Sequence, residues 1–163
     1  MSSTGDEVHD PAGARRRTLT DVLTELACRD VLVAFCRAVD DGRPDDAARL
    51  FTENCSVELG GPPVTGRESV RSALAGRPSG RRTLHTTGTT TVQVTGPDSA
   101  TASSVIVTYV LVDSDGTADG IPRRISAVTD QFARSADDCW LIAQRRTRDL
   151  TAQVSTDNRD HER

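Results

Sequence analysis

Two ionisable side chains in this sequence are candidates for proton-transfer chemistry. His85 is one of only three histidines, and it stands in the run "RTLHTTGTTTVQV", which otherwise reads as a plain strand of small β-formers. Asp40 lies four residues after Cys36 and seven after Val33, on a mainly apolar helix face. An imidazole oriented by a carboxylate exchanges protons near neutral pH. The residues alone leave other readings open, with His85 as a structural residue and Asp40 as a frayed helix end.

The elements that must position these residues are helices in the first half of the chain and strands in the second. The segment "DVLTELACRDVLVAFCRAVDD" predicts a long helix, capped by Thr18 or Thr20 and ending at Gly42. Shorter helices are expected over 44–51 and 67–76, with a strand over 55–59 and a turn over 60–66 between them. Strand-like segments rich in Thr, Val and Ile follow at 82–95, 99–113, 123–134 and 139–149.

This order of elements predicts an α+β fold with helices on one face of an antiparallel sheet. A sheet that curls around the long helix leaves a cavity between them, where a single domain tends to place its chemistry. The length of 163 residues fits one domain. The polar ends "MSSTGDEVHDPAGARRR" and "TAQVSTDNRDHER" indicate a disordered leader over 1–18 and a flexible tail over 151–163, around a folded domain at 19–150.

The composition argues against several classes of function. A net charge of -4 disfavours a nucleic-acid binder. No apolar stretch approaches the length of a membrane helix and no secretory signal is recognisable, so a cytoplasmic protein is expected. The four cysteines lack metal-ligand spacing, which indicates reduced thiols and no metal site. Neither a G-x-G-x-x-G motif nor a Walker loop occurs, so no cofactor is expected.

The sequence resembles a SnoaL-like domain of the nuclear transport factor 2-like superfamily over roughly residues 24–149. The resemblance rests on the helix end "AVD-x-G", on "LFT-x-x-C-x-V" and "GRESV", on the histidine that opens a strand, and on the final "CWLIAQRR". It implies a cone-shaped domain in which a strongly curved, mixed or antiparallel sheet wraps around the first helix. It also implies an open apolar pocket and a homodimer.

The resemblance also implies an activity. Relatives include polyketide cyclases, dehydratases, a dehydrochlorinase and ketosteroid isomerases. Several dehydratase-like members have an Asp at the position of Asp40 and a His at the position of His85, where the two act as a general-base dyad. Phe35 stands where the dehydrochlorinase has a Lys, which argues against assistance to a departing halide.

Four further residues are candidate substrate contacts: Phe35, Tyr109, Asp130 and Arg145. Arg145 matches a pocket-lining Arg of the dehydrochlorinase, and its alternative is a solvated charge at a strand end. Tyr109, the only tyrosine, either donates to a substrate oxygen or lies on the outer face of the sheet. Many relatives carry a Tyr two residues before Asp130, where this chain has Val128.

Together these features predict a small cofactor-free enzyme in which Asp40 and His85 move protons in an apolar pocket. The reaction would be dehydration, isomerisation or cyclisation of a hydrophobic small molecule, such as a polyketide-like or other natural-product intermediate. The alternative is a non-catalytic ligand-binding or dimerisation module, because a fold does not fix a function. The discriminating observation is whether Asp40 and His85 face each other inside a pocket.

Overall fold

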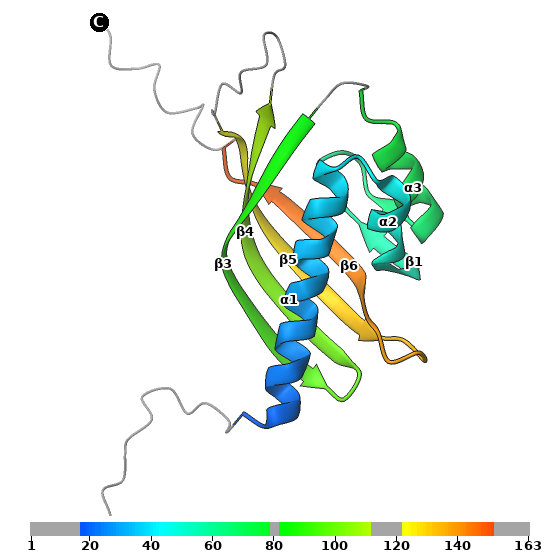
Figure 1. Cartoon of the computed structure of the whole chain (residues 1–163), viewed down its shortest axis with the longest axis vertical. Coiled ribbons are helices and arrows are strands. Elements are labelled where there is room, and N and C mark those ends of the chain that lie inside the picture. The colour runs from blue at the N-terminus through cyan, green and yellow to red at the C-terminus, as the bar shows by residue number, and fades with distance from the viewer. Residues whose placement is uncertain (1–16, 79–81, 112–121, 152–163) are drawn as a thin grey trace, which may run out of the picture.

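A long helix, α1 (Leu19–Asp40), lies across one face of a six-stranded curved sheet in the computed structural model, which describes residues 17–78, 82–111 and 122–151 (Figure 1). The α1 helix begins with a capping box, in which Thr18 Oγ1 accepts from the Asp21 backbone N–H and Asp21 accepts from the Thr18 N–H. It ends before Gly42, whose φ of 65° suits a residue without a Cβ.

The sheet contains β1 (Phe51–Val57), β2 (Val64–Thr65), β3 (Arg82–Gly96), β4 (Ser99–Leu111), β5 (Pro122–Arg134) and β6 (Trp140–Asp149), in the order β2-β1-β6-β5-β4-β3. Strands β3 to β6 form the expected antiparallel meander. Strand β1 pairs with β6 in parallel, so the sheet is mixed. The predicted α+β fold class, with a single curved sheet and an N-terminal helix, is confirmed.

Three local predictions for the first half were wrong at their boundaries. The second helix, α2 (Pro44–Arg49), ends before Phe51, which is fully buried and opens β1 instead. The strand predicted over 55–59 therefore begins four residues earlier and ends at Val57. The Ile142 N–H donates to the Leu50 carbonyl at 2.9 Å, and this bond links the start of β1 to β6. The expected turn over 60–66 contains the two residues of β2, which pair with the end of β1.

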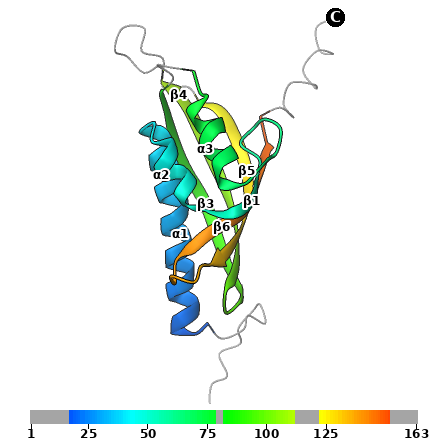
Figure 2. The same ribbon diagram turned by 90° about the vertical axis from the view of Figure 1, so that its right-hand side faces the viewer.

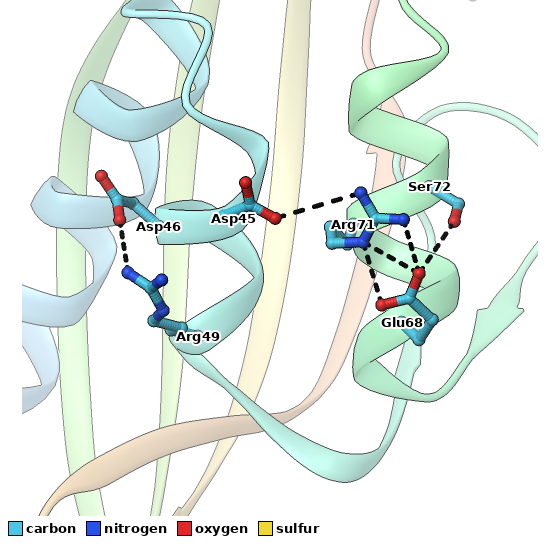
Figure 3. A network of polar contacts seen from close by, with 6 residues as sticks. All are labelled: Asp45, Asp46, Arg49, Glu68, Arg71 and Ser72. Carbon is cyan, nitrogen blue, oxygen red and sulfur yellow. Dashed lines mark hydrogen bonds and ion pairs between the residues drawn. The ribbon is translucent and has the colours of Figure 1, made fainter.

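The short helix α2 packs beside the C-terminal end of α1, and α3 (Arg67–Ala75) packs against α2 and β1 (Figure 2). Polar contacts join them on the outside: Arg71 binds Glu68 through two nitrogens and lies 3.9 Å from Asp45 of α2 (Figure 3). Exposed pairs of this kind stabilise by only about 0.2–1 kcal/mol each. The network therefore adds little to the stability of the fold.

The core between α1 and the sheet is built from small and aliphatic side chains with few aromatic rings. Phe35 of α1 meets Phe51 of β1 edge to face, with ring centroids 5.4 Å apart. Three cysteines, Cys28, Cys36 and Cys55, are free and buried, and burial raises the pKa of the Cys28 thiol to about 12. These thiols therefore act as small apolar groups.

Several predictions concern regions outside the described residues. The leader, apart from its last two residues, the tail after 151, and the end of the strand predicted over 99–113 all lie there. The domain boundaries stay predictions for that reason. None of the described helices has the length and apolar composition that crossing a membrane requires.

Candidate active site

Asp40 and His85 meet at the C-terminal end of α1. The His85 ring nitrogen Nδ1 lies 2.6 Å from Asp40 Oδ1, and the His85 backbone N–H donates to Asp40 Oδ2 at 2.8 Å. The Thr83 hydroxyl donates to Asp40 Oδ1 at 2.9 Å. Both oxygens of one carboxylate are thus occupied by the same short stretch of β3, which fixes the histidine ring relative to the helix end.

A second layer of contacts holds Thr83 in place. The Arg77 guanidinium, just after α3, donates to Thr83 Oγ1 at 3.0 Å and to the Val39 carbonyl at 3.1 Å. The second contact gives another donor to a carbonyl at the end of α1 that also accepts from the Gly42 N–H at 3.2 Å. Arg77 therefore links α1, α3 and β3 around the pair.

The electrostatics of the pair follow from these bonds. Burial raises the pKa of the Asp40 carboxyl, but the hydrogen bonds from the His85 ring, the His85 N–H and Thr83 lower it by more. The pKa of Asp40 therefore lies below its ordinary value of 3.8, and the group is ionised at neutral pH. A carboxylate at a helix C-terminus opposes the helix dipole, so these donors also offset that cost.

An ionised Asp40 selects the tautomer of His85. Because the carboxylate only accepts, it holds a proton on Nδ1 and leaves the lone pair of a neutral imidazole on Nε2. Among the described residues, Nε2 has no hydrogen-bond partner. The side chains of His85 and Asp40 are 17% and 15% exposed, so the pair is shielded from water without being sealed.

His85 lies in the wall of a cavity of about 640 Å³ between α1, α3 and the sheet. Its wall is mainly apolar, and a smaller recess of about 90 Å³ continues inward past His85. Apolar side chains from five elements or connections contribute to the larger space: Phe35, Val39, Leu59, Val64, Ala73, Leu74 and Val110. A largely apolar concavity with a few convergent polar groups is the usual form of a small-molecule site.

A buried carboxylate–guanidinium pair, Asp130 and Arg145, lies at the inner recess. Arg145 donates to Asp130 through Nε at 2.7 Å and through Nη2 at 3.1 Å, and both side chains are almost fully buried. The Arg145 guanidinium also lies 4.3 Å above the Phe35 ring, a cation–π contact. The alternative of a solvated strand-end charge for Arg145 is wrong, because the residue is 3% exposed.

Two of the four predicted substrate contacts line the cavity or its recess, and the other two do not. Phe35 and Arg145 line the cavity or its recess. Asp130 does not line it but is fully buried behind Arg145. Tyr109 pairs with Leu84 and lies between two cavity-lining residues of β4, so alternation directs its ring to the outer face of the sheet. Of the two positions expected for Tyr109, the structure supports the outer face.

Sequence reasoning missed several polar groups at the site. Thr83 stands two residues before His85 and shares its face of β3, a spacing that could have revealed it. Arg77, Arg123 and Arg124 also line the cavity, and no local pattern distinguishes them from surface arginines. Within the described part of the chain, no group of three or more His, Cys, Asp and Glu side chains is arranged to hold a metal ion.

The fold belongs to a known class of small α+β domains. The chain is a member of the SnoaL-like domain family, whose model matches residues 20–146. This match confirms the resemblance on which the sequence analysis relied. Among proteins with curated functional descriptions, none matches the chain.

Solved structures share the fold. A variant of Rv3472 from Mycobacterium tuberculosis, a protein of unknown function, is 25% identical with a TM-score of 0.68, over 80% of this chain and 79% of its own. A Catenulispora acidiphila protein in complex with S-DNPA is 19% identical, with a TM-score of 0.69 over 82% of this chain and 97% of its own. Aln2 from a Streptomyces species is 16% identical, with a TM-score of 0.71 over 86% of this chain and 98% of its own.

Proposed function

We propose that this protein is a small enzyme in which His85, oriented by Asp40, transfers protons on a hydrophobic small molecule bound in the cavity. The observation that carries the proposal is the 2.6 Å contact between Asp40 Oδ1 and His85 Nδ1 at the wall of a mainly apolar cavity. A positioned base of this kind contributes about 10²–10⁴-fold to the rate of proton transfer.

The chemistry starts at a carbon next to a carbonyl group. His85 Nε2 takes a proton from that carbon, and the ring, now charged, is stabilised by the ionised Asp40. The electron pair moves onto the carbonyl oxygen and forms an enolate. His85 then returns the proton, either to a leaving hydroxyl in a dehydration or to another carbon in an isomerisation. In a cyclisation, the enolate carbon attacks a second carbonyl and His85 protonates the new oxygen.

The surroundings of the pair favour this chemistry. The apolar wall excludes water, so a charge that develops on the substrate interacts strongly with nearby dipoles and cations. Arg145 provides such a cation at the inner recess, and Asp130 and Phe35 fix its position. We propose that Phe35 and Arg145 contact the substrate, while Asp130 acts only through Arg145.

The family resemblance extends the proposal to the biological setting. The known relatives that act on polyketides make a polyketide-like or other natural-product intermediate our proposed substrate. We also propose a homodimer that forms through the sheet, which sedimentation at tens of micromolar, roughly the range for a standard interface, would test. A monomer at that concentration would refute the dimer and leave the chemistry untouched.

Solvent-deuterium exchange tests the proposal without knowledge of the natural substrate. All three reactions begin with removal of a proton beside a carbonyl, so the protein should catalyse exchange of the acidic hydrogens of a bicyclic ketone such as 2-tetralone. The measurement is the loss of those proton signals by NMR in deuterated buffer. We expect His85→Gln to lower the catalysed rate by about 10²–10⁴-fold.

The control is Arg146→Gln, on the exposed side of β6, which should exchange like the wild type. If the wild-type protein binds the ketone and does not accelerate exchange, the proposed activity is wrong and the protein is a ligand-binding module. Unchanged exchange by His85→Gln would remove His85 from the reaction.

A further inference from the structure

Arginine side chains gather at the cavity, although the chain as a whole is acidic. The chain has 24 acidic and 20 basic residues. Yet four arginines line the cavity and its recess, and no described lining residue is an Asp or Glu: the arginines are Arg77, Arg123, Arg124 and Arg145. Cations that converge on a low-dielectric space attract a ligand of opposite charge.

Two of these arginines reach the cavity through a break in the strand pattern. Arg123 and Arg124 are consecutive in β5, so a regular strand would direct them to opposite faces. The β4–β5 register shifts at this point: Thr108 pairs with Arg124, whereas Tyr109 pairs with Pro122. A β-bulge inserts one extra residue and redirects a side chain, which allows both arginines to line the same cavity.

Arg124 is held in position from two sides. Its Nε lies 3.1 Å from Asp149 Oδ2 on β6. Its guanidinium rests against Gly60, where a Cβ atom would collide with it. Gly60 also has a φ of 89°, a conformation that favours glycine. The turn after β1 therefore leaves room for this guanidinium at the cavity wall.

Arg124 and His85 share one row across the sheet. His85 pairs with Thr108 of β4, and Thr108 pairs with Arg124 of β5, and all three side chains line both the cavity and its recess. Two strand spacings separate the backbones of His85 and Arg124, which is about 10 Å. A group bound at Arg124 would thus leave the neighbouring part of the same molecule over Thr108, within reach of His85.

We infer that the substrate is a hydrophobic acid whose anionic oxygen group, a carboxylate or a phosphate, binds at Arg124. This inference rests on the proposed function and narrows its substrate class. The planar guanidinium donates paired hydrogen bonds to such groups, and its position in the row with His85 places the acid end of the substrate opposite the base. Arg124 would then be a specificity-determining residue rather than a participant in proton transfer.

Three naphthalene probes test the inference, because they share a ring and differ in charge: 2-naphthoate, 2-naphthyl phosphate and the neutral 2-naphthamide. Their affinities are measured by titration calorimetry with the wild type, Arg124→Gln and the control Arg146→Gln. We expect at least one acid to bind the wild type about tenfold more tightly than the amide, equivalent to about 1.4 kcal/mol. The ratio of the amide Kd to the acid Kd should fall close to one in Arg124→Gln and stay at the wild-type value in Arg146→Gln.

The two acids distinguish a carboxylate from a phosphate as the anionic group of the substrate. The group is the one whose probe shows the larger preference over the amide that is lost in Arg124→Gln. Equal binding of acids and amide by the wild type, binding of none of them, or an undiminished preference in Arg124→Gln would overturn the inference. Catalysed exchange of 2-tetralone without acid preference would overturn this inference alone. Acid preference without any catalysed exchange would overturn the proposed function alone.

Discussion

Two carboxylates, Asp40 and Asp130, each bind a nitrogen-bearing side chain that lines the cavity or its recess, and the two pairs differ in what surrounds them. The Asp130–Arg145 pair is sealed, with side chains 0% and 3% exposed. The Asp40–His85 pair is partly open, with 15% and 17% exposed. Arg145 binds both oxygens of Asp130, whereas His85 binds Asp40 through Nδ1 and, among the described residues, has no hydrogen-bond partner at Nε2. Under the proposed function, the open pair transfers the proton, whereas the sealed pair stabilises the fold and fixes the Arg145 guanidinium beside the substrate.

The largest effect should come from breaking the sealed pair. Asp130→Ala leaves the Arg145 charge buried without a partner, and we expect a loss of about 3–5 kcal/mol in the free energy of unfolding. Urea denaturation followed by circular dichroism measures it. The double substitution Asp130→Leu with Arg145→Met, which replaces both charges by apolar groups, should recover much of that loss. A mild effect of Asp130→Ala alone would show that the pair is not sealed.

Breaking the open pair should affect activity more than stability. Asp40→Asn keeps the shape of the side chain and removes the charge that stabilises a protonated His85. We expect ketone exchange to fall by about 10²-fold or more, and the free energy of unfolding by only about 1–3 kcal/mol. The two assays used for His85→Gln and Asp130→Ala provide both numbers. If Asp40→Asn lost as much stability as Asp130→Ala and still catalysed exchange, the structural role would belong to the Asp40–His85 pair instead.

The smallest expected effect is a dependence of stability on acid pH. The pKa of Asp40 is lower in the folded than in the unfolded chain, so its contribution is complete above the unfolded value of 3.8 and is lost as the pH falls through the folded pKa. The difference in unfolding free energy between the wild type and Asp40→Asn should therefore shrink as the pH falls below the unfolded value of 3.8. A difference that widens toward acid would contradict the sign of the Asp40 shift.

The two pairs also differ in how far the sequence predicted them. Asp40 and His85 were recognisable because each is an unusual residue type for its surroundings, an acid on an apolar helix face and a histidine in a Thr-rich strand. The contact of Asp130 with Arg145 depends on the β5–β6 register, which brings residues fifteen apart opposite each other. No local pattern contains that register.

The same limit applies to the residues that were misplaced or missed. The face occupied by Tyr109 follows from its pairing with Leu84, and the approach of Arg123 and Arg124 to the cavity follows from a bulge. A shift of one residue reverses the face of every side chain in a strand. Composition and spacing therefore predicted the fold class, and the resemblance to the SnoaL-like family predicted the central pair, whereas the rest of the cavity wall required the pairing of strands.

The separation of Asp40 and His85 along the chain has a consequence for refolding. The two residues lie 45 positions apart in the chain, and neither α1 nor β3 alone contains the pair. A contact of this separation forms only after a long loop has closed, which is slow compared with the growth of a helix or a hairpin. The recovery of activity after dilution from urea should therefore lag behind the helical signal and report the moment at which α1 docks on the sheet.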